Sequence, residues 1–349
     1  MGEMVATGWD LGGAHIKAAQ IDAGGRLCRA IQIPCTLWRG LEHLEAALAS
    51  LDRELLPSDL QGVTMTGELV DLFADRGVGV GRLIDAMLAH CPGRELRFYA
   101  GEMGFLAPAA ARAQVLRIAS ANWHATGRYL AARGETGLLV DIGSTTTDIL
   151  PVANGEMECE GFSDSERMTL EELVYTGVTR TPVMAVALTV LFAGRHQRLM
   201  AEYFATMADV HRLTGELPED ADQHGTADGR GKSAEESAAR LARMLGRDLA
   251  DAGMAEWRRL ARHLAERQRR QLIDSIERVL SRSSLPENAP LIGAGVGRFL
   301  LPEIGRRLGR PYRDFADLFQ GEPASREWAA RAAPAAAVAG LLLQLRKAV

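Results

Sequence analysis

One short pattern occurs twice in this sequence, and this repeat restricts the fold more than any other feature. Residues 10–19 read DLGGAHIKAA, and residues 141–150 read DIGSTTTDIL. In each copy an Asp ends an apolar run, a turn of small residues follows, and a second apolar run comes after it. Apolar runs separated by such turns predict β-hairpins. The repeat therefore predicts two units of related layout, one in each half of the chain.

Both turns are suited to binding a phosphate group. The small residues Gly12, Gly13, Gly143 and Ser144 let backbone N–H groups approach an anion closely. Other side chains could add donors or positive charge, namely His15, Lys17, Thr145, Thr146 and Thr147. A hydrogen-bonded structural histidine is the alternative reading of His15. Asp10 and Asp141, at the strand ends, are candidate Mg²⁺ ligands, because Mg²⁺ prefers oxygen atoms.

The rest of the chain reads as alternating strands and helices. Residues 4–35 are expected to form a β-meander of three strands at 5–12, 14–22 and 26–35. Further strands are expected at 63–67, 97–101, 138–143, 144–152 and 289–295, and helices at 40–56, 68–75, 79–90, 120–133, 183–208, 234–283 and 296–309. The polar, Gly-rich segment 218–237 predicts a long loop. We expect a first domain at 1–135 and a second at 136–349, the second carrying a helical insertion at about 183–283.

Composition excludes several classes of protein. Hydrophobic residues make up 47% and charged residues 24% of the 349 residues, which argues against disorder. The net charge of −5 argues against a nucleic-acid binder with a broad basic face. Four cysteines without a C-x-x-C pair predict neither a metal cluster nor a disulfide framework. Without a signal peptide or an apolar run of about 20 residues, a cytoplasmic protein is expected, and its oligomeric state stays open.

A third Gly-rich turn, GAGVG at 293–297, follows the strand predicted at 289–295. Together, DLGGAHIK, DIGSTTTD and LIGAGVG resemble the two phosphate motifs and the adenosine motif of the acetate kinase, sugar kinase, Hsp70 and actin superfamily. This resemblance implies an α/β fold of two ribonuclease-H-like lobes with a central cleft. It also implies that Gly293, Ala294, Gly295 and Gly297 contact a nucleotide or another substrate.

Three longer stretches carry a more specific resemblance. Residues 64–80, 176–183 and 209–248 are similar to those of the hydantoinase/oxoprolinase-like proteins linked to tetrahydromethanopterin-dependent one-carbon transfer. The activity known in that group joins an (aminomethyl)furanmethyl diphosphate to the phenol oxygen of γ-glutamyltyramine and releases pyrophosphate, in methanofuran biosynthesis. In a bacterial methylofuran pathway, tyrosine could supply the phenol. The resemblance thus implies small-molecule substrates and an enzyme of the transferase class.

This reaction needs charge stabilisation on the departing diphosphate, which Mg²⁺, backbone N–H groups and Lys17 could supply. It also needs a base, because a phenol with a pKa of about 10 is mostly protonated at neutral pH. Asp148 and Asp10 are the candidate bases, and Asp148 is preferred. An ATP-dependent small-molecule kinase or an oxoprolinase-like hydrolase is the alternative, so the use of ATP stays open. A nucleotide-gated activator protein is disfavoured, because the cysteines are not clustered.

Several other residues could contact a substrate, but each could instead have a purely structural role. Glu68 and Asp71 follow the strand predicted at 63–67, where they could instead interact with a helix dipole. Arg180 could contact substrate or form a surface ion pair. The segment GTADGRGKS is not a P-loop, because Thr226 stands where the motif requires Gly and no strand precedes it. Its residues Asp228, Arg230 and Lys232 could still order over a substrate.

Overall fold

The computed structural model describes residues 5–348 and divides into two compact units. The first unit comprises the chain through Gly137, the segment Val152–Glu158, and the chain from Arg313 onward. The second unit comprises Leu138–Pro151 and Cys159–Tyr312. The chain from Arg313 onward therefore lies in the first unit, whereas the contiguous division into 1–135 and 136–349 had it in the second.

The first unit is built on a mixed sheet with the strand order β15-β3-β2-β1-β4-β5-β6. Its strands are β1 (Val5–Leu11), β2 (His15–Asp22), β3 (Arg26–Pro34), β4 (Leu60–Met65), β5 (Glu95–Tyr99), β6 (Phe105–Leu106) and β15 (Gln320–Gly321). The first three form an antiparallel meander, and β4 and β5 continue parallel to β1. The meander predicted from the sequence is therefore confirmed.

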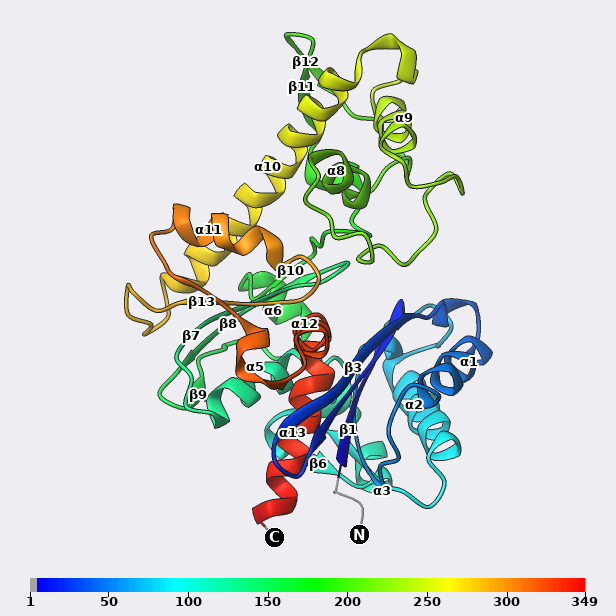
Figure 1. The fold of residues 1–349 in the computed structure, drawn as a ribbon, viewed down its shortest axis with the longest axis vertical. Helices are drawn as coiled ribbons and strands as arrows, with labels where there is room; N and C mark the ends of the chain where they lie inside the picture. Colours follow the sequence, from blue (N-terminus) through cyan, green and yellow to red (C-terminus); the bar gives the residue numbers. More distant parts are fainter. Residues whose placement is uncertain (1–4, 349) are drawn as a thin grey trace. The chain divides into compact units, whose positions relative to one another are not determined.

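Helices cover both faces of this sheet (Figure 1). They are α1 (Leu41–Asp52), α2 (Arg76–His90), α3 (Pro108–Arg112), α4 (Val115–Ile118), α5 (Asn122–Ala132), α12 (Pro323–Arg331) and α13 (Ala333–Ala348). Trp9 and Leu11 are fully buried in a core shared with α1 and α2. Gly8 points to the opposite face, where a Cβ atom would lie 2.1 Å from the carbonyl oxygen of Ala335. This close backbone contact explains why α13 belongs to the first unit.

The second unit repeats the layout of the first. Its sheet has the strand order β10-β8-β7-β13-β14, formed by β7 (Gly137–Ile142), β8 (Thr147–Ala153), β10 (Leu173–Val174), β13 (Leu291–Ala294) and β14 (Tyr312–Asp314). A short strand β9 (Glu156–Met157) also pairs with β8. β7 therefore takes the place of β1, β8 that of β2, and β13 that of β4, with β13 parallel to β7. Both sheets have the ribonuclease-H-like strand order, so the α/β fold implied by the resemblance is confirmed, as are the two units of related layout predicted from the repeat.

A helical region extends from the second unit, formed by α7 (Val183–Val186), α8 (Met207–Thr214), α9 (Ala234–Met244) and α10 (Met254–Leu280). The long α10 is the yellow helix of Figure 1. Two shorter helices, α6 (Asp164–Thr169) and α11 (Leu301–Arg307), lie outside this region. The loop predicted between the helices is confirmed, because no helix or strand lies between α8 and α9.

Two helix predictions were wrong. Most of 183–208 is not helical, because β11 (Thr189–Phe192) and β12 (Arg195–Arg198) form a hairpin there. The β-branched and aromatic residues of β11 and the positive φ angles of Ala193 and Gly194 favour this turn over a helix. Residues 68–75 contain only a 3₁₀ turn at Gly67–Leu69. Within residues 5–348 no single helix is long and apolar enough to span a bilayer; α12 and α13 pass that test only as a pair, bent by 103°.

Candidate functional site

The two Asp turns have the same backbone hydrogen bond. The Gly12 N–H donates to the carbonyl oxygen of His15 at 3.0 Å, and the Gly143 N–H donates to that of Thr146 at 2.8 Å. In both copies the donor follows the Asp by two residues and the acceptor follows it by five. The sequence repeat is therefore a repeat of turn structure. Because these two N–H groups are used inside the turns, other groups of each turn would have to bind an anion.

Asp10 ends β1 and is almost completely buried, at 2% exposure. Its Oδ2 accepts a hydrogen bond from Lys17 Nζ at 3.2 Å across the paired strands β1 and β2. Its Oδ1 is buried and has no hydrogen-bond partner in the part of the chain that the structure describes. A buried carboxylate oxygen of this kind calls for an explanation, and a bound cation is one. Asp10 therefore has the chemistry of a Mg²⁺ ligand.

The described residues contain no group of three or more His, Cys, Asp or Glu side chains arranged to hold a metal. Mg²⁺ does not require such a group, because it is commonly held by one or two carboxylates together with water and substrate phosphates.

Asp141 ends β7 and is half-buried beside the third Gly-rich turn. Gly295 has a φ angle of +81°, and a Cβ atom there would lie 2.3 Å from Asp141 Oδ1 and 2.2 Å from the carbonyl oxygen of Ile142. Gly297 donates its N–H to that same carbonyl at 2.8 Å, and Ala294 pairs with Asp141. Close packing inside the second unit thus explains why the residue at this position, Gly295, has no Cβ atom. Gly293, Ala294 and Gly297 are buried as well.

The segment 176–183 wraps around the second turn. Val178 donates its N–H to the carbonyl of Gly143, and Thr179 and Arg180 donate theirs to the carbonyl of Ser144, at 3.1, 3.2 and 2.8 Å. Arg180 Nη1 also donates to Thr145 Oγ1 at 3.1 Å. The structure therefore brings Arg180 to the turn, although 35 residues separate it from Thr145. Thr147 is buried, and its hydroxyl donates to the carbonyl of Thr176 at 2.7 Å.

Asp148 forms an ion pair that the sequence did not reveal. Arg167, only 1% exposed, donates from Nη2 to Asp148 Oδ1 at 2.8 Å and to the carbonyl of Glu172 at 3.0 Å. The buried Glu172 carboxylate in turn accepts from Arg282 at 3.1 Å. Burial, with a smaller contribution from the negative charge of Glu172, raises the pKa of the nearby Cys159 thiol to about 12, so this cysteine is not a thiolate nucleophile at neutral pH.

The remaining candidates in the first unit differ in exposure. Glu68, which follows β4, is 1% exposed, and its Oε1 accepts from Ser120 Oγ at 3.0 Å. Asp71 is exposed on the surface. His15 is 6% exposed and begins β2 directly after the first turn. The structure thus places Glu68 and His15 inside the unit and Asp71 in contact with solvent.

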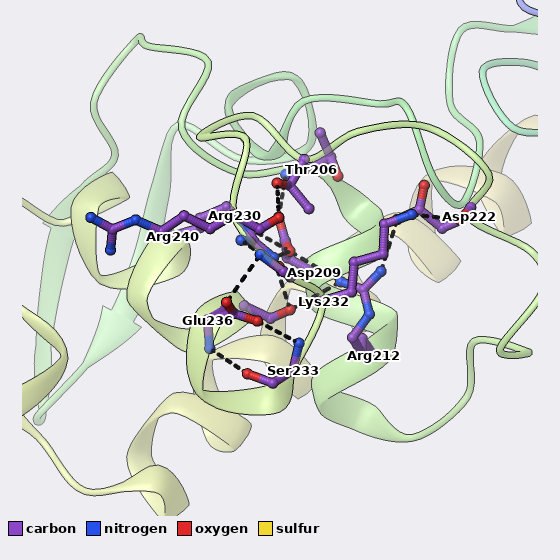
Figure 2. A network of polar contacts seen from close by, with 12 residues as sticks. Thr206, Asp209, Arg212, Asp222, Arg230, Lys232, Ser233, Glu236 and Arg240 are labelled. Carbon is purple, nitrogen blue, oxygen red and sulfur yellow. Dashed lines mark hydrogen bonds and ion pairs between the residues drawn. The ribbon is translucent and has the colours of Figure 1, made fainter.

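The loop between α8 and α9 is held by ion pairs around a buried arginine (Figure 2). Arg240, with a fully buried side chain, donates to Asp209 Oδ1 at 2.7 Å and to Asp228 Oδ1 at 3.0 Å. Lys232 Nζ donates to the carbonyl of Asp222 at 2.7 Å, and the carbonyl of Arg230 accepts from Thr226 Oγ1 at 2.6 Å. Asp228 and Lys232 therefore fasten the loop itself. Sequence reasoning missed Asp209 and Arg240, which lie 31 residues apart on two helices.

Comparisons with known proteins agree with the fold. Residues 59–314 match the family model described as hydantoinase/oxoprolinase. The chain is 32% identical over 246 residues to the "(4-{4-[2-(gamma-L-glutamylamino)ethyl]phenoxymethyl}furan-2-yl)methanamine synthase" of Methanocaldococcus jannaschii, covering 70% of this chain and 72% of that protein. The synthase of the same name from Methanococcus vannielii is 33% identical over 112 residues, covering 32% of this chain and half of that one.

Among solved structures, the nucleotide-free structure of acetone carboxylase, an enzyme of ATP-dependent acetone carboxylation, superposes with a TM-score of 0.57. The match has 12% sequence identity and covers 88% of this chain and 68% of that chain, so it supports the fold alone. The family model covers well over half of the residues, and the chain therefore belongs to the hydantoinase/oxoprolinase family.

Proposed function

We propose that this protein is a transferase of methanofuran or methylofuran biosynthesis. It couples an (aminomethyl)furanmethyl diphosphate to the phenol oxygen of a γ-glutamyltyramine-type or tyrosine-type acceptor and releases pyrophosphate. The observation that carries the proposal is the 32% identity over 70% of the chain to an enzyme named as a synthase of a phenoxymethyl-furan amine. That name describes a product in which an ether oxygen links a phenyl ring to a furan methylene group.

The reaction exchanges one C–O bond for another. The bond between the furan methylene carbon and the diphosphate breaks, and the diphosphate leaves with the electron pair. The furan oxygen delocalises the positive charge that develops on the carbon. The phenol oxygen then forms the new bond, and its proton passes to a base. Catalysis thus requires stabilisation of the leaving anion and a proton acceptor near the phenol.

The first turn supplies groups for the leaving anion. Lys17 Nζ, 3.2 Å from Asp10 Oδ2 and partly exposed, carries a positive charge beside the turn formed by Gly12, Gly13 and His15. Asp10, with its buried Oδ1, is the proposed Mg²⁺ ligand of the first unit, and Asp141, at the corresponding place of the second unit, is also a candidate ligand. When bound, Mg²⁺ would neutralise charge on the diphosphate.

The second turn supplies hydroxyl groups and the proposed base. Ser144, Thr145 and Thr146 are all half-buried in the turn, as expected of groups that contact a ligand. Asp148 is the proposed proton acceptor, and its contact with Arg167 fixes the orientation of the carboxylate. Arg167 is therefore proposed as a positioning residue, which acts on the substrate only through Asp148.

A reaction without nucleotide tests the proposal. Purified protein given the furanmethyl diphosphate, a phenolic acceptor and Mg²⁺, but no ATP, should form the ether and pyrophosphate in equal amounts. The acceptor analogue in which hydrogen replaces the phenol hydroxyl should yield no ether. Absence of both products with the phenolic acceptor would disprove the transferase.

The alternative is an ATP-dependent small-molecule kinase or an oxoprolinase-like hydrolase. The observation that favours it is the buried turn 293–297 beside Asp141, at the place where the sequence resemblance expects adenosine. ADP formation that depends on an added small-molecule substrate would support this alternative over the transferase.

A further inference from the structure

The two Asp turns differ in charge at one corresponding position. Lys17 follows Asp10 by seven residues and contacts it, whereas Asp148 follows Asp141 by seven residues. Asp148 is itself paired with the buried Arg167. The strand that leaves the second turn thus carries an acid where the strand that leaves the first carries a cation. An anion at the second turn would need a positive charge from another segment.

Arg180 provides a positive charge at that turn. Its Nη1 donates to the hydroxyl of Thr145 at 3.1 Å, so the guanidinium lies directly on the turn. The side chain is half-buried and remains partly open to solvent. A guanidinium has five N–H donors in one plane and can contact two oxygens of a phosphate group at once. Its position and chemistry therefore suit an anionic ligand.

The backbone on both sides of Arg180 is firmly anchored. Thr179 and Thr181 are buried, at 3% and 4% exposure. Their carbonyls accept from the N–H groups of Ala208 and Met207 at the start of α8, at 3.3 and 2.9 Å. The Arg180 N–H donates to the carbonyl of Ser144 at 2.8 Å. The turn, residues 179–181 and α8 thus hold the arginine in place, and little side-chain ordering is left to occur when a ligand binds.

We propose that Arg180 is the diphosphate-binding cation of the second turn, with the role that Lys17 has at the first. The inference rests on the proposed function only in naming the substrate's diphosphate as the ligand. The same chemistry would hold the phosphates of a nucleotide. A direct measurement of pyrophosphate and ADP binding therefore distinguishes the diphosphate of the substrate from that of a nucleotide.

The test measures binding of inorganic pyrophosphate and of ADP to the full-length protein by isothermal titration calorimetry, with Mg²⁺ present. Arg180→Gln should weaken pyrophosphate binding by about 10- to 100-fold, the size expected for loss of a charge-assisted contact. Arg180→Lys should lose less affinity for pyrophosphate, because the positive charge is kept. Arg267→Gln, which changes an exposed arginine on α10, is the matched control and should bind as the wild type does.

Thr145→Val provides a second variant that leaves the arginine unchanged, and it should weaken binding less than Arg180→Gln does. Thermal unfolding of each variant checks that the fold is intact. Pyrophosphate binding by Arg180→Gln within about twofold of the Arg267→Gln control would overturn the proposal, and so would a wild-type protein that binds neither ligand. If Arg180→Gln loses as much affinity for ADP as for pyrophosphate, the result would point to a nucleotide as the source of the diphosphate.

The binding experiment contains no furan donor and no acceptor. If the wild type forms no ether but Arg180→Gln still loses pyrophosphate binding, the transferase proposal fails and the assignment of Arg180 stands. If ether forms normally in Arg180→Gln and its pyrophosphate binding is unchanged, the assignment fails and the transferase stands.

Discussion

Arg167 Nη2 lies 2.8 Å from Asp148 Oδ1, and the two side chains are only 1% and 16% exposed. This pair places a buried guanidinium beneath the strand that leaves the second turn. Removing the carboxylate would break an ion pair with a guanidinium in a poorly solvated place, which is costly. The proposed base thus also contributes to folding, and its two roles can be separated.

Asp148→Asn should lower the free energy of unfolding by about 3 kcal/mol, because it removes the carboxylate that forms an ion pair with the buried guanidinium of Arg167. Urea denaturation measures this change. The double variant Asp148→Asn with Arg167→Gln should recover much of the stability but not the transferase activity. A single variant as stable as the wild type would contradict the structural role, and an active double variant would contradict the role of base.

Asp10→Asn should raise the Mg²⁺ concentration needed for half-maximal activity by at least about tenfold, because a neutral amide is a weaker ligand for a hard cation. A Mg²⁺ titration of the coupling reaction measures the shift. Glu45→Gln changes an exposed carboxylate of the same unit and serves as the control. Equal Mg²⁺ dependence in the two variants would rule out Asp10 as a ligand.

Gly295→Ala should destabilise the second unit by about 3 kcal/mol or more, because the added methyl group would overlap Asp141 Oδ1 and the carbonyl of Ile142. Gly229→Ala is a matched control, since Gly229 also has a positive φ angle but its Cβ would meet no atom within 4 Å. That control isolates the backbone strain, worth about 1 kcal/mol. Thermal unfolding measures the stability of both variants. Equal losses of stability in Gly295→Ala and Gly229→Ala would show that packing around Gly295 is not tight.

Glu216 should make stability depend on acid pH. Burial alone would raise the pKa of this carboxyl, but hydrogen bonds from His211 and Thr214 and the charge of Arg269 outweigh it and lower the pKa to about 2. A depressed pKa means that the stabilisation is fully present above the unfolded-state value, about 4.5, and is lost as the pH falls toward 2.

Unfolding free energies of the wild type and Glu216→Gln at several pH values test this dependence. The difference between the two proteins should stay constant above about pH 4.5 and shrink as the pH falls toward 2. A difference that does not change with pH would mean that the ionised carboxylate contributes nothing.

The sequence predicts those features that depend on neighbouring residues. The two hairpins, with Asp10 and Asp141 at their strand ends, follow from apolar runs separated by turns of small residues. The repetition of this pattern also predicts that the two units share a layout. The same local signals misled the helix prediction at 183–208, where a β-hairpin forms instead. There the apolar pattern was too short to distinguish helix from strand.

Contacts between distant segments were not predictable. Arg167 is 19 residues from Asp148, Arg180 is 35 from Thr145, and Arg240 is 31 from Asp209. Each pair is joined by the packing of different elements, and the sequence shows only a charged residue on each side. No local pattern identifies the partner of a buried charge. The structure therefore adds the residues that surround the two turns, which periodicity and motifs could not supply.

The contact between Gly8 and α13 has a consequence for synthesis on the ribosome. Strand β1 emerges long before α13, the helix that covers it, because most of the residues described here lie between them in the chain. At typical translation rates, tens of seconds separate the two events. During that interval one face of the first sheet lacks its helix, and all residues of the second unit are synthesised before α13 is. We therefore expect the nascent chain to acquire its second unit first and to close its first unit only when α13 has emerged.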